Sequence, residues 1–303
     1  MGGAAAAVTV FYSPDYTATR FAFDTVRKAA WVAASLTERP IEGVRVTTPQ
    51  LLTSEGLERV HAAEYVRAVG SGEPRWLAES SGIGWDPAVW TAVRASNGGA
   101  VAAALHALRE RTNAGSLSSG LHHASHASGA GFCTFNGLGL AARAALDAGA
   151  SCVLIVDLDA HCGGGTWSLV RDWPGVRQLD IAVSRFDGYQ PEPASGSTLD
   201  IVARSRAYLP TLASRLHALD AEHFDLVIYN AGMDVHQASG IGGLIGIDEQ
   251  VISAREQAVF AWARGRAVPV AFVLAGGYTG GEMSAERLVN LHRMTMTEAA
   301  CRG

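Results

Sequence analysis

The sequence has little lysine, no excess of positive charge and no long apolar run. Lys28 is the only lysine among 303 residues, and the formal net charge is −5. An acidic chain with scattered arginines offers no basic surface for nucleic acid or for an anionic membrane. Apolar runs stay well short of the roughly 18 residues that a membrane span needs, and the first residues lack the pattern of a signal peptide. We therefore expect a soluble protein.

Cysteine is also scarce. The chain has four cysteines, which form no CxxC pair and no regular framework: Cys133, Cys152, Cys162 and Cys301. A buried free thiol behaves as a small hydrophobic group, whereas a disulfide framework is typical of small secreted domains. The cysteine pattern therefore favours a reducing, cytoplasmic setting.

The most informative stretch is residues 152–166, CVLIVDLDAHCGGGT. Residues 153–156 form a continuous aliphatic run, which is typical of a strand buried on both faces of a parallel sheet. Asp157, Asp159 and His161 follow at every second position, so an extended chain would point all three side chains the same way. The glycines after them force a turn. These polar groups are therefore expected at the carboxyl end of the strand, where open α/β sheets bind ligands.

Two carboxylates and an imidazole at the end of a hydrophobic strand are costly to bury unless they bind something. Carboxylate oxygen and imidazole nitrogen are ligands that suit zinc or iron(II). The alternative is a turn at the strand end with solvated polar residues, and this stretch alone leaves that alternative open. The pattern favours a divalent metal site.

Segments with strand patterns alternate with segments of helical spacing along the whole chain. The expected strands are 8–12, 41–46, 153–156, 178–183, 226–229 and 268–274. The expected helices are 20–36, two short helices on either side of His61, 86–111, 135–148, 167–172, 199–219, 248–264 and 282–298. This alternation, without linker or repeat, predicts one domain over residues 1–303, an α/β sandwich with a mainly parallel central sheet.

Further polar groups lie after other strands or in loops, and a parallel sheet would bring them to the same edge. Asp234 follows the expected strand 226–229, so that Asp159, His161 and Asp234 would supply three metal ligands and leave positions open for water and substrate. Three protein ligands with open positions are typical of a catalytic rather than a structural metal site.

The remaining groups supply the other parts of a hydrolytic site. His122 and His123 offer a proton acceptor for water activated by the metal. Tyr278 follows two glycines that allow close approach of the backbone, and its hydroxyl can donate to a developing oxyanion. The whole set describes metal-assisted hydrolysis of an amide or a related carbonyl compound.

These motifs, in this order, resemble the histone deacetylase superfamily, which has the arginase/deacetylase fold. The matching segments are HH at 122–123, GFC at 131–133, DLDAH at 157–161, NAGMD at 230–234 and GGY at 276–278. The resemblance covers nearly the whole chain, and the segments YNAGMDVH and FAWARGRAVPV look most like the class IV branch. It implies an α/β sandwich around a mainly parallel sheet.

The resemblance also implies a role for each matching residue. The implied metal ligands are Asp159, His161 and Asp234, with zinc as the metal and iron(II) as the other possibility. The implied catalytic residues are His123 as general base and acid, His122 beside it, Asp157 as the buried partner of His122, and Tyr278 as the hydroxyl that polarises the carbonyl. Phe132 would form a wall of the acyl channel, with Gly131 and Gly277 also at the substrate. The implied substrate is an acylated amine: an acyl-lysine peptide, a polyamine or a small biosynthetic amide.

The chain departs from the family pattern after the ligand histidine. The run there is Cys162, Gly163, Gly164, so that the residue expected to orient His123 is missing. From this we expect that Gly164→Asn raises kcat/KM. The register of the strand 178–183 is not fixed by its sequence, so the resemblance predicts no definite monovalent-cation site. His126 matches no family position, and we expect it to be exposed.

Two other classes of function are compatible with parts of the pattern. An arginase-like binuclear hydrolase would need another carboxylate two residues beyond His161, where this chain has Gly163. A non-catalytic binding or sensor protein would explain Gly164, but it would not need the full set of ligands or Tyr278. The sequence therefore favours the metal-dependent deacylase.

Overall fold

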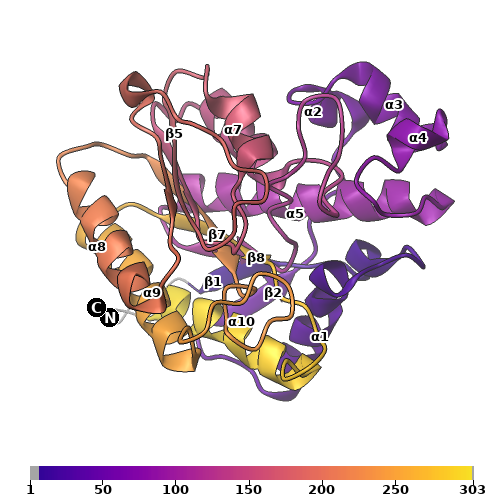
Figure 1. Ribbon diagram of the computed structural model, residues 1–303. Coiled ribbons are helices and arrows are strands. Elements are labelled where there is room, and N and C mark those ends of the chain that lie inside the picture. The colour runs from indigo at the N-terminus through magenta and orange to yellow at the C-terminus, as the bar shows by residue number, and fades with distance from the viewer. Residues whose placement is uncertain (1–6, 302–303) are drawn as a thin grey trace, which may run out of the picture.

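The computed structural model describes residues 7–301 and shows an eight-stranded sheet in which all paired strands are parallel (Figure 1). The strand order is β2-β1-β3-β8-β7-β4-β5-β6. The strands are β1 Val8–Phe11, β2 Val44–Thr47, β3 Ala114–Ser116, β4 Val153–Asp157, β5 Val176–Ala182, β6 Thr198–Ile201, β7 Leu226–Gly232 and β8 Val270–Ala275. The prediction of an α/β sandwich with a parallel central sheet is confirmed.

Helices cover both faces of the sheet (Figure 1). They are α1 Asp24–Glu38, α2 Ser54–Glu58, α3 Ala63–Ser71, α4 Arg75–Ala78, α5 Pro87–Glu110, α6 Gly137–Asp147, α7 Gly164–Val170, α8 Tyr208–Ala218, α9 Glu249–Gly265 and α10 Ala285–Ala300. Short 3₁₀ turns lie at Pro14–Thr17, Pro193–Ser195 and Ser205–Ala207. In the part of the chain that the structure describes, no helix combines the length and apolarity that crossing a membrane requires.

The central strand β4 shows why its sequence is apolar throughout. Val153 and Ile155 belong to a hydrophobic core shared with α5 and α6 on one face of the sheet. Leu154 and Val156 belong to the other core, which is shared with α1, α8, α9 and α10. Each side chain is almost completely buried, and burial of one such aliphatic group contributes about 1.5–3 kcal/mol. Alternate residues thus pack on opposite faces, as expected for a strand covered on both sides.

Two strands of the structure, β6 and β3, were not predicted as strands. The expected helix 199–219 is wrong in its first part, because Thr198–Ile201 pairs with β5 as the edge strand β6 and the helix α8 begins at Tyr208. The strand β3 was not predicted, since its three residues, Ala114–Ser116, carry no β-branched side chain. The register of β5 is also now defined, because Asp180 lies opposite Asp157.

Candidate active site

The carboxyl ends of β4 and β7 bring the predicted metal ligands together. Ligand atoms of Asp159, His161 and Asp234 all lie within 4.8 Å of one another. The Nδ1 atom of His161 is 3.1 Å from Oδ1 of Asp159 and 3.2 Å from Oδ2 of Asp234. The neighbouring strands β4 and β7 are paired along their length, which explains how residues so distant in sequence meet.

This cluster has the properties of a metal site. Oδ2 of Asp234 is buried, and the described residues 7–301 offer it no hydrogen-bond partner of good geometry. Burial, together with the charge of Asp159, raises the pKa of Asp234 to about 6. Burial opposes protonation of His161, but its contacts with both carboxylates raise its pKa to about 10. Two buried carboxylates and one imidazole with converging ligand atoms fit a divalent cation, and the donor set suits zinc or iron(II).

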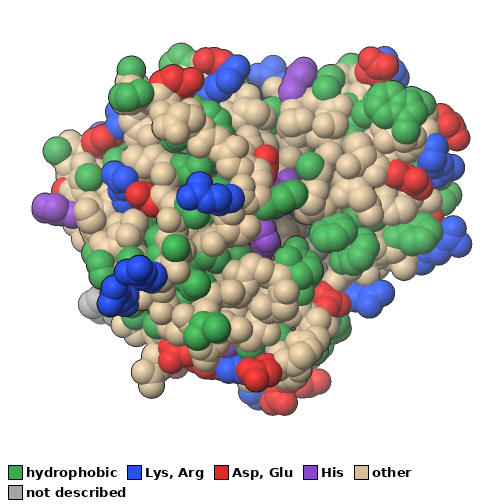
Figure 2. All heavy atoms as spheres, in the orientation of Figure 1, with side chains coloured by type: hydrophobic (Ala, Val, Ile, Leu, Met, Phe, Trp, Pro, Cys, Tyr) green, Lys and Arg blue, Asp and Glu red, His purple; other side chains and the backbone are tan. Residues whose placement is uncertain are grey.

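Access to this cluster is through a cleft lined by the other predicted residues. His122, His123, Gly131, Phe132 and Tyr278 line it together with the ligands Asp159 and His161. Figure 2 shows a hollow near the middle of this face, with a histidine in it and hydrophobic side chains beside it. The lining of the cleft includes Gly276 and not the predicted Gly277. A Cβ atom added at Gly277 would lie 2.4 Å from Cδ1 of Leu288.

The two adjacent histidines, His122 and His123, are held by different carboxylates. Nδ1 of His122 donates to Oδ2 of the buried Asp157 at 2.8 Å. Oδ1 of Asp157 in turn accepts from the side-chain amide of Asn230 at 2.8 Å. Nδ1 of His123 donates to Oδ2 of Asp187 at 2.9 Å. The expectation that His123 lacks an orienting partner is therefore wrong.

These hydrogen bonds define the charge of the histidine pair. With both Nδ1 atoms donating to carboxylates, the two Nε2 atoms face each other at 3.0 Å, so one of them carries a proton and the other accepts it. Burial alone would lower the pKa of His122, but Asp157 and Asp159 raise it to about 10. Burial and the charge of His122 lower the pKa of His123. We infer that His122 is the imidazolium and that His123 is neutral.

Several residues at the site carry no motif that sequence reasoning could use. The ring of Phe186 lies edge-on to those of His123 and His161, with centroids 4.9 Å and 5.9 Å away, and the side chain is 51% exposed. Lys28, which looked unremarkable in the sequence, is fully buried, and its ammonium donates to Oγ of Ser119 at 2.8 Å. Burial lowers the pKa of Lys28 to about 7.

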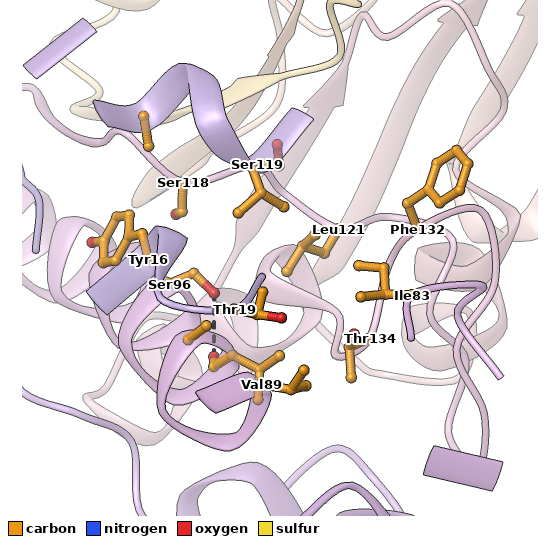
Figure 3. Close-up of a pocket in the computed structure, with 14 residues that line it drawn as sticks. Tyr16, Thr19, Ile83, Val89, Ser96, Ser118, Ser119, Leu121, Phe132 and Thr134 are labelled. Atoms are coloured by element: carbon orange, nitrogen blue, oxygen red, sulfur yellow. Dashed lines mark hydrogen bonds between the residues drawn. The ribbon is translucent and has the colours of Figure 1, made fainter. Parts of the chain in front are cut away.

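An apolar cavity adjoins the cleft and shares Ser119, Leu121 and Phe132 with it. Its volume is about 530 Å³ when the space open to solvent is included. Figure 3 shows Phe132 at one end of the cavity and Tyr16 at the other, with Leu121 and Ile83 near Phe132. The remaining wall comes mainly from α1 and α5, which contribute Val26, Ala29, Val89, Ala92, Val93 and Ser96.

His61 supports the loop that carries His122 and His123. Its Nδ1 donates to the carbonyl of Ser125 at 2.9 Å, while its Nε2 accepts from the backbone N–H of Asn136 at 2.9 Å. The second contact requires an unprotonated Nε2, so the imidazole is neutral in the folded protein. His126, by contrast, is exposed, as its lack of a family counterpart predicted.

We expect His61 to make the protein acid-sensitive. Burial lowers its folded pKa from 6.5 to about 4. The unfolded chain therefore binds more protons in this range, and stability falls as the pH drops from 6.5 towards 4, by up to roughly 3 kcal/mol. The test is the free energy of unfolding in urea, measured at about pH 7 and about pH 5. The difference between the two values should be smaller in His61→Gln than in the wild type. His217→Gln, at a histidine that is 85% exposed, is the control. An unchanged pH dependence in His61→Gln would contradict this role.

The sequence motifs thus converge in one cleft, and a comparison with known proteins gives the family. The family model described as a histone deacetylase domain matches residues 22–293. The chain belongs to the histone deacetylase family. Within that family, it is 32% identical to an uncharacterized protein of Picosynechococcus over 89% of this chain and 91% of the relative. It is 27% identical to a probable deacetylase of Methanothermobacter thermautotrophicus over 77% of this chain and 74% of the relative.

Solved structures show that this histone deacetylase family member also has the family fold. The HDA15 HD domain superposes with a TM-score of 0.80 at 21% identity, over 97% of this chain and 90% of that chain. An acetylpolyamine aminohydrolase from Burkholderia pseudomallei superposes with a TM-score of 0.78 at 18% identity, over 96% of this chain and 98% of that one. Family membership supports hydrolase activity on amides.

Proposed function

We propose that the chain is a zinc-dependent amidohydrolase that removes an acyl group from an amine with water as the nucleophile. The observation that carries the proposal is the convergence of three metal-ligand side chains, a histidine pair and a tyrosine hydroxyl in one accessible cleft. We further propose that residues 1–303 form one catalytic domain. Free cysteines suit a cytoplasmic protein of this kind.

In this proposal, Asp159, His161 and Asp234 hold the metal. A zinc ion in such a site supplies a Lewis acid that polarises the amide carbonyl and lowers the pKa of water. His123 takes a proton from the attacking water at Nε2 and later gives it to the leaving amine. His122 stays protonated beside it, paired with Asp157.

Tyr278 supplies the remaining contact with the reacting group. Burial and the nearby carboxylates raise the pKa of Tyr278, so its phenol keeps its proton. The hydroxyl can therefore donate to the carbonyl oxygen as negative charge develops on it, and such a donor stabilises the transition state more than the ground state. Gly276, two residues before Tyr278, has a φ of 55°, which lies in the left-handed region. A side chain at Gly276 would come within 2.3 Å of Oδ1 of Asp234.

The apolar cavity next to the cleft bears on the acyl group of the substrate. The apolar cavity behind Phe132 can accommodate an acyl chain that extends beyond the cleft. Its wall consists mainly of aliphatic and small side chains. We propose that the substrate is an acyl-lysine peptide, a polyamine or a small biosynthetic amide, and that chains longer than acetyl enter this cavity.

Hydroxamates with acyl-like tails test this choice of acyl group. We expect affinity to rise as the tail grows from about two to about eight carbons, by up to about 0.8 kcal/mol for each buried methylene. The inhibition constants of such a series measure the effect. Ala92→Leu, which narrows the cavity from α5, should weaken the long-tailed inhibitors and leave the shortest one unaffected. Affinity that falls with tail length would show that the enzyme prefers a small acyl group.

Turnover assays test the proposed reaction directly. We expect the protein to release amine from an acyl-lysine peptide or an acetylated polyamine, and to stop when a chelator removes its metal. Screening both substrates with several acyl chains also identifies the substrate class. Bound metal without turnover of any acylated amine would favour a non-catalytic binding protein instead.

A further inference from the structure

We propose that Asp187 is the positioning residue of His123 and that it supplies, from a different loop, the carboxylate that position 164 lacks. The inference rests on the proposed function, since His123 is the general base there. Asp187 lies in the loop after β5, and it is separated from His123 by 64 residues. Nothing in the sequence around Asp187 pointed to this contact.

Two hydrogen bonds fix the carboxylate of Asp187. Its Oδ2 atom accepts from Nδ1 of His123 at 2.9 Å and from the backbone N–H of Gly165 at 3.0 Å. Hydrogen bonds to an ionised carboxylate are stronger than those between neutral groups. The second donor keeps the oxygen in place when the imidazole gains or loses its other proton.

The loop itself is anchored on both sides of Asp187. The carbonyl of Phe186 accepts from the backbone N–H of Cys162 at 3.1 Å. The hydroxyl of Tyr189 donates to the buried Asp180 at 3.1 Å, and its ring stacks on Trp167 with centroids 5.3 Å apart. Asp187 has a φ of 58°. Aspartate is among the few non-glycine residues that adopt this left-handed conformation readily.

Gly164 leaves the space that this loop occupies. A Cβ atom at position 164 would lie 2.2 Å from the backbone oxygen of Asp187 and 2.5 Å from its Oδ1. The first of these clashes is with backbone, so a side chain there would displace the loop. The loop conformation that brings Asp187 to His123 therefore requires glycine at position 164. The premise of the Gly164→Asn expectation, that His123 has no orienting partner, does not hold, and we now expect this variant to lower kcat/KM.

The contact has a definite chemical consequence. An acceptor at Nδ1 keeps the neutral imidazole of His123 in the tautomer whose unprotonated Nε2 is the basic nitrogen. The charge of Asp187 then stabilises the imidazolium that forms. The titratable groups around His123 are His122, Asp159, His161 and Asp187. Of the two carboxylates, Asp159 also contacts His122 and His161.

Asp187→Asn tests the proposal, because it keeps the shape and an acceptor oxygen but removes the charge. We expect kcat to fall between about 10-fold and about 100-fold, with KM and metal content little changed. Without the carboxylate the imidazolium is less stable, so the acidic limb of the kcat/KM profile should move to lower pH. Asp187→Gly, which suits the positive φ, should lose more activity than Asp187→Asn. Asp172→Asn, at a carboxylate that is 85% exposed, should match the wild type.

A second measurement does not depend on activity. In protein with ¹⁵N-labelled histidine, the Nδ1 protons of His122 and His123 should give separate low-field resonances, and Asp187→Asn should shift that of His123 alone. If the wild type turns over no acylated amine, the proposed function fails while this resonance still tests the hydrogen bond. A wild-type kcat and pH profile in Asp187→Asn, a rate loss that follows loss of metal, or a faster Gly164→Asn variant would each overturn the proposal.

Discussion

Asp159→Asn is expected to bind no metal and to show no measurable turnover. The substitution keeps the size of the side chain but removes the charge of a ligand whose oxygen lies 3.1 Å from Nδ1 of His161. The remaining ligands, His161 and Asp234, leave a divalent cation with too few charged donors. Loss of the metal removes several kcal/mol of transition-state stabilisation, so kcat/KM should fall by about a thousandfold or more.

Elemental analysis and turnover, measured on the same preparation, check this result. Asp172→Asn makes the same chemical change at an exposed carboxylate and should keep both metal and activity. The free energy of unfolding of each variant, measured without metal, shows whether the fold is intact. Full metal occupancy in Asp159→Asn would remove Asp159 from the ligand set.

Tyr278→Phe is expected to lower kcat by about 10²–10³-fold while the metal content stays the same. The ring lines the cleft beside Asp159 and His161, and phenylalanine preserves its packing there. The substitution deletes one hydroxyl donor, which acts on the carbonyl oxygen mainly in the transition state. KM should therefore change much less than kcat.

Steady-state kinetics with the best substrate of the acyl panel measures this effect. Tyr12→Phe is a matched control, because Tyr12 lies outside the cleft and packs edge-on against Tyr16. A kcat close to the wild-type value in Tyr278→Phe would show that the hydroxyl of Tyr278 does not stabilise the oxyanion.

The fold was largely predictable because the strands are covered on both faces. Apolar runs such as residues 153–156 mark a buried parallel strand, and the acidic and histidine residues after them mark its carboxyl end. The apolar pattern did not identify strands that are incompletely buried or very short. Residues 198–201 form an edge strand whose leucine and isoleucine also fit a helical pattern, and β3 has three small residues.

The site was predictable to the extent that its residues lie in motifs. Asp157, Asp159 and His161 are close in sequence, and the alternation of a strand is enough to place them on one side. Asp187 could not be predicted, because its role depends on how the loop after β5 folds back over Gly164. The sequence shows that position 164 has no side chain to orient His123. It does not show that Asp187 takes this role, because the loop that carries Asp187 contains no motif.

The central claim is that a single metal ion, held by Asp159, His161 and Asp234, makes this protein an amidohydrolase. Titration of the metal-free protein with zinc, followed by release of amine from an acyl-lysine peptide, tests that claim most directly. We predict no turnover before zinc is added, a linear increase with zinc, and saturation at one ion per chain, as expected from the one ligand cluster found among residues 7–301. Turnover in the metal-free protein, or saturation only at two ions per chain, would contradict it.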